Sequence, residues 1–345
     1  MNDNLLLLTA CDVTALLADA DQQALSAVRA AYVAHAFGRT YVPPSSFIHF
    51  PDTPENRIIA LPSYIDQNGP VIGIKWIASF PANVDLGMDR ASAVVILNSA
   101  QTGRPEVILE GSEISAVRTA ASAALAAQTL GSVKGPIHVS LVGCGRINFT
   151  VVRFLCAIFG EIEGLCVFDK VPERAAAFAK SCQRCYDVRR AQIADGMPKA
   201  LSFSQLISFA TTATAPHVQD LSLCPPGTVI LHISLRDLSP EIILDADNVV
   251  DDENHVCSAR TSLHLAECAS GHRKFIRASL PEILAGRAPA RAESCGPVIF
   301  SPFGLGILDL AVASFVTNRA RERGMGISIP FFSSSFSGKL NGHRA

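Results

Sequence analysis

A glycine-rich stretch in the middle of the chain has residue types suited to holding a phosphate group. An apolar run ending at residue 142 leads into Gly-Cys-Gly, and a helical pattern follows at once. Gly143 permits a tight strand-to-helix turn, and Gly145 lets the backbone come close to a pyrophosphate. The helix then begins at Arg146 and Ile147, whose free N–H groups can donate to the phosphate. The sequence thus predicts the first turn of a dinucleotide-binding unit.

Two further residues bear on the nucleotide that this turn would hold. Asp169 ends the next predicted strand, where a carboxylate accepts hydrogen bonds from both ribose hydroxyls and repels a 2′-phosphate, which favours NAD over NADP. Asn148 stands where a third glycine would bring helix and strand together. We expect this asparagine to loosen the contact between helix and strand and to lower the affinity for NAD.

Three cations in apolar or small-residue surroundings suit a substrate with several carboxylates. Lys75 lies in a strand-like run between Ile and Trp, where a charge is costly unless it has an anionic partner. Arg118 interrupts an alanine-rich stretch, and Arg90 precedes Ala-Ser-Ala. Arginine binds a carboxylate through two parallel hydrogen bonds, and lysine acts as a point charge. Each cation could instead belong to an ordinary structural salt bridge.

Two carboxylates complete the set of candidate residues. Asp237 follows an apolar strand, and the carboxyl ends of such strands face the ligand crevice in doubly wound folds, so it could act as a general base on water or an amine. Its alternative role is that of an acidic residue ahead of the helix start at 239–240. Asp309 could stabilise the start of the last helix or line the crevice.

Two kinds of segment must position these residues. Before residue 131, the pattern predicts helices over 12–38 and 113–130, with β-like runs at 57–61, 71–77 and 93–97. After residue 131, strands alternate with helices, which predicts a parallel sheet with helices on both faces. The predicted strands are 137–142, 164–168, 207–213, 228–233 and 248–250, and the predicted helices are 147–159, 172–183 and 304–323. The Ser/Gly-rich tail from Ser333 is predicted to be disordered.

Composition narrows the class of protein. The chain has 345 residues, of which 49% are hydrophobic and 17% charged, so it can bury a large core. A net charge of −2 without a basic block argues against nucleic acid and anionic membranes as partners. Its sequence shows neither a spanning segment nor a signal peptide, so we expect a cytoplasmic protein. The cysteines and histidines lack metal-ligand spacing, so no metal site is predicted.

Several strings in this order resemble the ornithine cyclodeaminase/mu-crystallin family over nearly the whole chain. The closer resemblance is to the branch that makes 2,3-diaminopropionate for siderophores and peptide antibiotics. The strings are Asn56–Pro62, Gly73–Ser79, Arg90–Ser92, Ile96–Asn98, Arg118–Ala121, Val142–Gly145, Ile233–Asp237 and Gly304–Asp309.

The resemblance implies a fold and an activity. The fold is an α/β Rossmann doubly wound parallel sheet over 131–297, plus an α+β substrate-binding and dimerisation domain made of 1–130 with 298–345. The activity is NAD-dependent oxidation of N-(2-amino-2-carboxyethyl)-L-glutamate to an imine, which water splits into 2,3-diaminopropionate and 2-oxoglutarate. A homodimer is expected.

The resemblance also implies residue roles. Lys75 and Arg118 would bind the substrate carboxylate or polarise its reacting centre, and Asp237 would handle the proton and water. Arg90 and His49 would bind further carboxylate groups. His49 departs from the family pattern, because relatives of this branch carry Arg there, and only a protonated histidine matches that charge.

Other functions remain open from the sequence. Ornithine cyclodeaminase and ketimine or imino-acid reductase would keep the cofactor and change the chemistry. A cyclodeaminase needs an acid to hold the distal amine, whereas Arg90 and His49 favour an anion. A non-catalytic nucleotide-binding protein, as some mu-crystallins are, or an NAD-binding structural subunit would leave Lys75 and Asp237 without a catalytic role.

Overall fold

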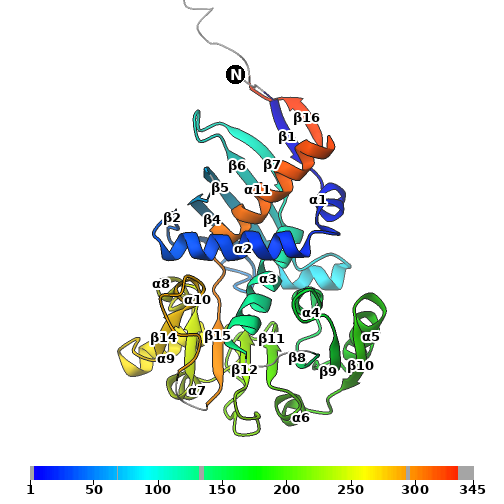
Figure 1. Cartoon of the computed structure of the whole chain (residues 1–345), viewed down its shortest axis with the longest axis vertical. Helices are drawn as coiled ribbons and strands as arrows, with labels where there is room; N and C mark the ends of the chain where they lie inside the picture. Colours follow the sequence, from blue (N-terminus) through cyan, green and yellow to red (C-terminus); the bar gives the residue numbers. More distant parts are fainter. Residues whose placement is uncertain (1–3, 68, 132–135, 293–295, 333–345) are drawn as a thin grey trace, which may run out of the picture.

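The chain folds around two β-sheets, as the computed structural model of residues 4–67, 69–131, 136–292 and 296–332 shows (Figure 1). Sheet A consists of β1 (Asn4–Leu8), β2 (Thr40–Tyr41), β3 (Ser46–His49), β4 (Arg57–Asp66), β5 (Pro70–Ser79), β6 (Ala91–Asn98), β7 (Pro105–Glu110) and β16 (Ile327–Pro330). Sheet B consists of β8 (Ile137–Val142), β9 (Ile162–Phe168), β10 (Val188–Ile193), β11 (Leu206–Phe209), β12 (Val229–His232), β13 (Asp247–Val250), β14 (Ile276–Ser279) and β15 (Val298–Ser301).

Helices cover these sheets and join them. They are α1 (Ala10–Leu17), α2 (Asp21–Ala36), the short 3-10 helix η1 (Pro81–Leu86), α3 (Ser112–Leu130), α4 (Arg146–Phe159), α5 (Pro172–Cys185), α6 (Met197–Ser202), α7 (Pro240–Asp245), α8 (Glu253–Val256), α9 (Ser262–Ser270), α10 (Leu280–Leu284) and α11 (Gly306–Arg323). The helix expected over 12–38 is two helices: α1, which Thr9 caps with a capping box, ends at Leu17, and α2 begins at Asp21. The tail from Ser333 lies outside the described residues.

Sheet B confirms the predicted doubly wound parallel sheet. Its strand order is β10-β9-β8-β11-β12-β15-β13-β14, and every pairing between these strands is parallel. All residues of β11, β12 and β15 are buried, as expected for a sheet covered on both faces. The strand order changes direction between β8 and β11, which is where such folds bind their ligands.

The parallel sheet extends further along the chain than the predicted boundary at residue 298. Strand β15 pairs with β12 on one side and β13 on the other, so it lies inside sheet B. Its four residues are all buried, and the apolar run Val298–Phe300 suits a strand that lies between two other buried strands. The chain leaves sheet B only after Ser301.

Sheet A is antiparallel through β4, β5, β6 and β7, and β1 adds in parallel at the edge of β7. Helices α2 and α11 pack against one face of this sheet (Figure 1). The chain crosses from sheet A to sheet B through the alanine-rich helix α3. Its alanines at 120, 121, 123, 124, 126 and 127 are buried, so their small side chains allow neighbouring helices to approach closely.

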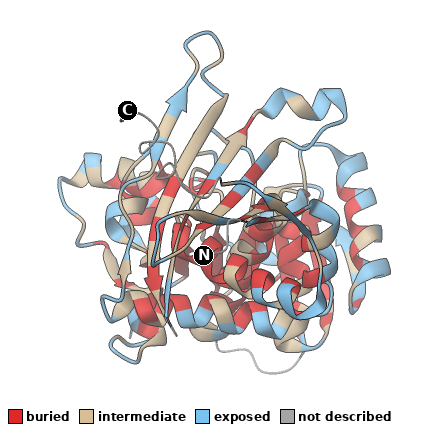
Figure 2. Cartoon of the chain, turned by 90° about the horizontal axis from the view of Figure 1, so that it is seen from above, coloured by how far each residue is buried: buried red, intermediate tan, exposed pale blue. Residues whose placement is uncertain are grey.

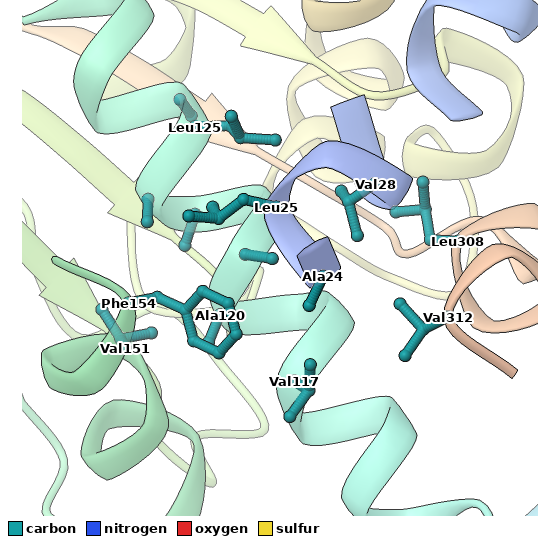
Figure 3. Close-up of a cluster of buried hydrophobic side chains, with 14 of the residues drawn as sticks. Ala24, Leu25, Val28, Val117, Ala120, Leu125, Val151, Phe154, Leu308 and Val312 are labelled. Atoms are coloured by element: carbon teal, nitrogen blue, oxygen red, sulfur yellow. The ribbon is translucent and has the colours of Figure 1, made fainter. Parts of the chain in front are cut away.

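The principal hydrophobic core connects the two sheets. Figure 3 shows its side chains meeting from four helices: Ala24, Leu25 and Val28 of α2, Val117, Ala120 and Leu125 of α3, Val151 and Phe154 of α4, and Leu308 and Val312 of α11. A second core lies against the other face of sheet B and includes residues of α6, α7 and α9. Figure 2 shows buried residues gathered centrally, with exposed residues on the outer loops and helix surfaces. Among the described helices, none is long and apolar enough to cross a membrane.

Candidate active site

Lys75, Arg118 and Asp309 form one buried charged triad. Lys75 is on β5, Arg118 on α3 and Asp309 in the first turn of α11. The Lys75 Nζ atom lies 2.8 Å from Asp309 Oδ2, and Arg118 Nε lies 3.2 Å from Asp309 Oδ1. Ser115 Oγ accepts from Lys75 Nζ at 3.3 Å. Asp309 is the anionic partner that Lys75 requires, and a single carboxylate faces two cations.

The electrostatic balance of the triad favours an incoming anion. Lys75 is 2% exposed, and burial lowers its pKa to about 8, helped by the neighbouring Arg118 and opposed by Asp309. Because two positive groups share one carboxylate at neutral pH, the triad keeps one positive charge. A substrate carboxylate beside the triad would neutralise that charge with bidentate help from Arg118.

The loop before α11 fits closely against Arg118. Gly304 has φ +96°, and a Cβ atom there would lie 2.5 Å from Arg118 Nη1. The backbone N–H of Gly304 donates to Asp251 Oδ2 at 2.7 Å, and that of Phe303 donates to Oδ1 at 2.9 Å. The buried Asp251 carboxylate thereby holds the loop that limits where the Arg118 guanidinium can move.

The predicted nucleotide turn has the geometry that a dinucleotide requires. Gly143 has φ +91°, and a Cβ there would lie 2.4 Å from the carbonyl oxygen of Ala210, just past β11. A Cβ on Gly145 would meet nothing within 4 Å, so the backbone faces open space at this point. Helix α4 starts at the next residue, Arg146, and directs its first N–H groups toward this turn. These residues therefore fit a pyrophosphate.

Asn148 strengthens the contact that we expected it to loosen. Its side chain is fully buried, and Nδ2 donates to the carbonyl oxygens of Val142 at 3.1 Å and Gly143 at 2.7 Å. Its Oδ1 accepts from Ser208 Oγ at 2.8 Å. The expected loosening was wrong because the amide replaces close backbone packing with three hydrogen bonds that join α4 to the end of β8, the turn after it and β11. The effect of Asn148 on NAD affinity stays a prediction.

Asp169 and Arg146 lie on either side of the turn. Asp169 Oδ2 accepts from the Cys144 N–H at 2.9 Å and Oδ1 from the Val171 N–H at 3.0 Å. A carboxylate has about four acceptor positions, so lone pairs remain for ribose hydroxyls. The Arg146 side chain instead pairs with Asp89, in the loop before β6, and with Glu113 of α3. Arg146 can therefore serve a cofactor through its backbone N–H, while its side chain ties the two sheets together.

Asp237 follows β12 and is fully buried. Its carboxylate accepts from Thr211 and Ser234, and it lies 3.1 Å from His217 Nε2. Burial alone would raise the pKa of Asp237, but hydrogen bonds from His232, Ser234 and Thr211 hold it well below its usual range. The anionic form is therefore strongly favoured. Of its two histidine neighbours, His232 is buried and His217 has a side chain that is 29% exposed.

The remaining predicted substrate residues, Arg90 and His49, lie near the carboxyl end of β5, whereas Lys75 of the triad lies in the middle of that strand. Arg90 donates to Ser79 Oγ at 2.8 Å, and Ser79 is the last residue of β5. His49 is exposed and stacks on Phe47, and the strand register places it opposite Arg57. Lys75, Arg118 and Asp309 thus form one group, and Arg90 and His49 lie outside it, near the carboxyl end of β5.

Sequence reasoning missed several residues that the structure brings into this region. Ser115 lies one helical turn before Arg118, so helix periodicity could have identified it. Arg57 and Arg236 are cations within strings that we used only to recognise the family. His217 lies in a loop without a motif, and no signal in one sequence indicated its contact with Asp237. Within the described ranges, no cluster of three or more His, Cys, Asp or Glu side chains is arranged to hold a metal.

Known proteins share this architecture. The model of the ornithine cyclodeaminase/mu-crystallin family matches residues 4–324. The N-((2S)-2-amino-2-carboxyethyl)-L-glutamate dehydrogenase of Staphylococcus aureus is 28% identical over 340 residues, covering 96% of this chain and 100% of that protein.

Solved structures agree over the same length. Δ1-pyrroline-2-carboxylate reductase of Thermococcus litoralis, in complex with NADH and L-proline, matches with a TM-score of 0.86 and 25% identity over 94% of this chain and 99% of that chain. An archaeal alanine dehydrogenase dimer with bound NAD matches with a TM-score of 0.83 and 26% identity over 95% of this chain and 100% of that chain. Since the family match spans nearly all of the sequence and these relatives align along their whole length, this chain belongs to the ornithine cyclodeaminase/mu-crystallin family.

Proposed function

We propose that this protein oxidises a CH–NH bond in an amino acid that carries several carboxylates, with N-(2-amino-2-carboxyethyl)-L-glutamate as the substrate. The observation that carries the proposal is the buried triad of Lys75, Arg118 and Asp309, which keeps one positive charge. The chain is an NAD-dependent oxidoreductase of its family, and dehydrogenases and reductases are prominent among its relatives. The identity of the substrate is our inference from the resemblance to the 2,3-diaminopropionate branch, and the cations around the site support a substrate with several carboxylates.

The cofactor would be held by the turn after β8. The backbone N–H groups of Arg146 and Ile147 would bind the pyrophosphate beside Gly143 and Gly145, and Asp169 would accept hydrogen bonds from the ribose. When bound, NAD supplies a hydride acceptor. The side-chain amide of Asn148 keeps the turn in place by binding its carbonyl groups.

The substrate would be held by the cations. Lys75 and Arg118 would bind the carboxylate next to the reacting carbon, while Arg90 and His49 would bind more distant carboxylates. Removing a hydride from the glutamyl Cα and a proton from the attached nitrogen leaves an imine on the substrate. Water then adds to that imine carbon, and the C–N bond breaks to give 2-oxoglutarate and 2,3-diaminopropionate.

Asp237 would handle the proton during hydrolysis of the imine. Its lowered pKa keeps the carboxylate ionised, so it can stabilise a positive charge on a neighbouring histidine. His217 is the more exposed of the two neighbouring histidines, at 3.1 Å from Asp237 Oδ1. We therefore infer that Asp237 acts on water through His217, since a buried carboxylate with several partners has no direct access to it.

We also propose an oligomeric state and a cellular location for the protein. The described cysteines are all free, which suits a reducing compartment, and we propose a cytoplasmic enzyme. Trp76, Val94 and Ile48 are exposed on strands of sheet A, and this apolar surface supports a homodimer. We assign the product to the biosynthesis of a siderophore or a peptide antibiotic. The residues before and after sheet B would supply the substrate-binding and dimer contacts.

A single incubation tests the proposed reaction. The protein is mixed with N-(2-amino-2-carboxyethyl)-L-glutamate and NAD, and NADH absorbance and 2-oxoglutarate release are followed together. Equal amounts of both products are expected, and Lys75→Gln should abolish them while NAD still binds. Folded protein that binds NAD and forms no NADH would refute the proposal. Turnover of ornithine, or reduction of a cyclic imine with NADH, would support the alternative chemistries.

A further inference from the structure

A group of three arginines lies beyond the triad. Arg57 begins β4, Arg90 precedes β6, and Arg236 lies in the turn after β12. Arg90 donates to Ser79 Oγ, and Arg236 Nη2 donates to the carbonyl oxygen of Ala259 at 2.7 Å. The Nε atom of Arg57 is buried and has no hydrogen-bond partner. Across the part of the chain that the structure describes, none of the three forms an ion pair with a carboxylate.

The strand registers place this cluster on the same face of sheet A as the triad. Arg57 is opposite Ser79 on β5 and opposite His49 on β3, and directly opposite residues point to one face. Lys75 and Ser79 also share a face, since they are separated by an even number of residues. At about 3.3 Å per residue, the Cα atoms of Lys75 and Ser79 are about 13 Å apart. Long side chains extending from both ends shorten the gap to the length of a small amino acid.

Arg236 brings a charge from the other sheet. Burial lowers the pKa of Arg236, the Arg57 guanidinium lowers it further, and the neighbouring Asp237 carboxylate opposes both effects. Arg57 has the same effect on Arg90. The turn that carries Arg236 is strained, because Leu235 adopts φ +66°, a conformation that a leucine rarely takes. The three cations thus come from both sheets, and the charge of Arg57 acts unfavourably on the other two.

We propose that Arg57, Arg90 and Arg236 form a subsite for the distal carboxylate of a dicarboxylic or tricarboxylic substrate. The triad of Lys75, Arg118 and Asp309 would hold the reacting end, an assignment that rests on the proposed function. Arg57 and Arg236 are the residues that set the preference for a second carboxylate. An anion among the three guanidiniums removes their repulsion and satisfies the free Arg57 Nε.

Binding of two keto acids tests this subsite. Protein saturated with NADH is titrated calorimetrically with 2-oxoglutarate and with 2-oxopentanoate, which has the same carbon chain and no distal carboxylate. The unmodified protein should bind 2-oxoglutarate at least about tenfold more tightly, as expected for charge-assisted hydrogen bonds. Arg57→Gln and Arg236→Gln should each lose that preference and keep the affinity for 2-oxopentanoate. Arg190→Gln, on the exposed edge strand β10, is the matched control and should keep the preference.

The outcomes separate this inference from the proposed reaction. Equal binding of the two acids by the unmodified protein would overturn the inference, as would a full preference retained by both variants. Because the measurement is binding, it stands whether or not NADH forms from N-(2-amino-2-carboxyethyl)-L-glutamate. Melting curves verify folding, and removing one of three repelling charges should leave the melting temperature equal or raised.

Discussion

At the scale of single residues, anion binding at the site depends on an excess of cations over carboxylates. Asp309 alone faces Lys75 and Arg118, although both cations are removed from water. Removing one ion from water costs about 5 kcal/mol or less after the protein has relaxed around it, unless partner groups compensate. The remaining positive charge can therefore stabilise a bound anion. Ser115 accepts from Lys75 and adds a neutral partner that leaves the charge unchanged.

The proton on Lys75 should limit substrate binding at high pH. Its pKa is lowered to about 8, so the ammonium is present at pH 7 and lost as the pH rises through 8. We expect kcat/KM for a carboxylate substrate to fall by about tenfold per pH unit above that value, as for loss of one required proton. Initial rates from pH 6 to 10 measure this.

A Lys75→Gln variant is the control for that pH profile. It should bind the substrate weakly throughout and lack the step near pH 8. Its effect on folding also has a defined sign. Because the pKa of Lys75 in the folded protein lies below its ordinary value of 10.5, the unfolded state binds more protons between about pH 8 and 10.5, and the unmodified protein gains stability as the pH rises over this interval. Values of kcat/KM for the unmodified protein that stay constant up to pH 9.5 would contradict the role of Lys75.

At the scale of elements, helix α4 and the strands beneath it act as one unit. Asn148 binds the carbonyl oxygens at the end of β8 and accepts from Ser208 in β11. Gly143 approaches the carbonyl oxygen of Ala210, just past β11. The turn is thus fixed from the helix and from the neighbouring strand at the point where the strand order changes direction. Its N–H groups are held ready without the cofactor ordering them.

Replacing Asn148 should weaken this unit. Asn148→Gly removes three buried hydrogen bonds, leaves Ser208 without its partner and adds a flexible residue to the helix, at a cost of about 4 kcal/mol in unfolding free energy. NAD affinity should fall as well, since the turn loses its support. Urea unfolding and NAD titration measure both effects. Ala176→Gly, at an exposed position in α5, is the control for helix propensity alone and should cost about 1 kcal/mol.

At the scale of the whole molecule, the two sheets share one core and one charged region. Helix α3 begins beside sheet A and packs on α4, β12 and β15 of the parallel sheet. Arg146 adds ion pairs across the same junction. Figure 1 shows α2 and α11 on one face of sheet A. Some large apolar side chains of this sheet remain exposed, namely Trp76 at 42% and Val94 at 38%, and the register pairs them directly.

The paired Trp76 and Val94 should mark the dimer contact. Exposed apolar side chains on adjacent strands lose favourable burial if a charge is introduced, so Trp76→Glu with Val94→Glu should yield monomers. Light scattering after size exclusion measures the mass in solution. Ile193→Glu, at an equally exposed apolar position on β10, is the control and should leave the mass unchanged. A dimer that persists in the double variant would place the contact elsewhere.

The sequence by itself determined the elements and motifs that depend on neighbouring residues. The turn around Gly143, the helix predicted over 113–130 and the alternation of strands and helices follow from local spacing, because glycine, alanine and apolar periodicity act over a few residues. These patterns predicted the parallel sheet and the position of the nucleotide turn. They also indicated that Lys75 needs an anion, because burial of a lone charge is costly wherever it occurs.

Only the tertiary structure decided which distant residues meet. Lys75 and Asp309 are separated by 234 positions, and the charge of Arg57 in sheet A acts on the pKa of Arg236, which follows a strand of sheet B. The buried hydrogen bonds of Asn148 strengthen the contact between helix and strand that we expected its side chain to loosen. Strand β15 lies between β12 and β13 in sheet B, although β14 separates it from β13 in the sequence. One sequence records each charge but not its partner, because the partner is chosen by packing of the whole chain. That packing turned scattered cations into a triad and an arginine cluster.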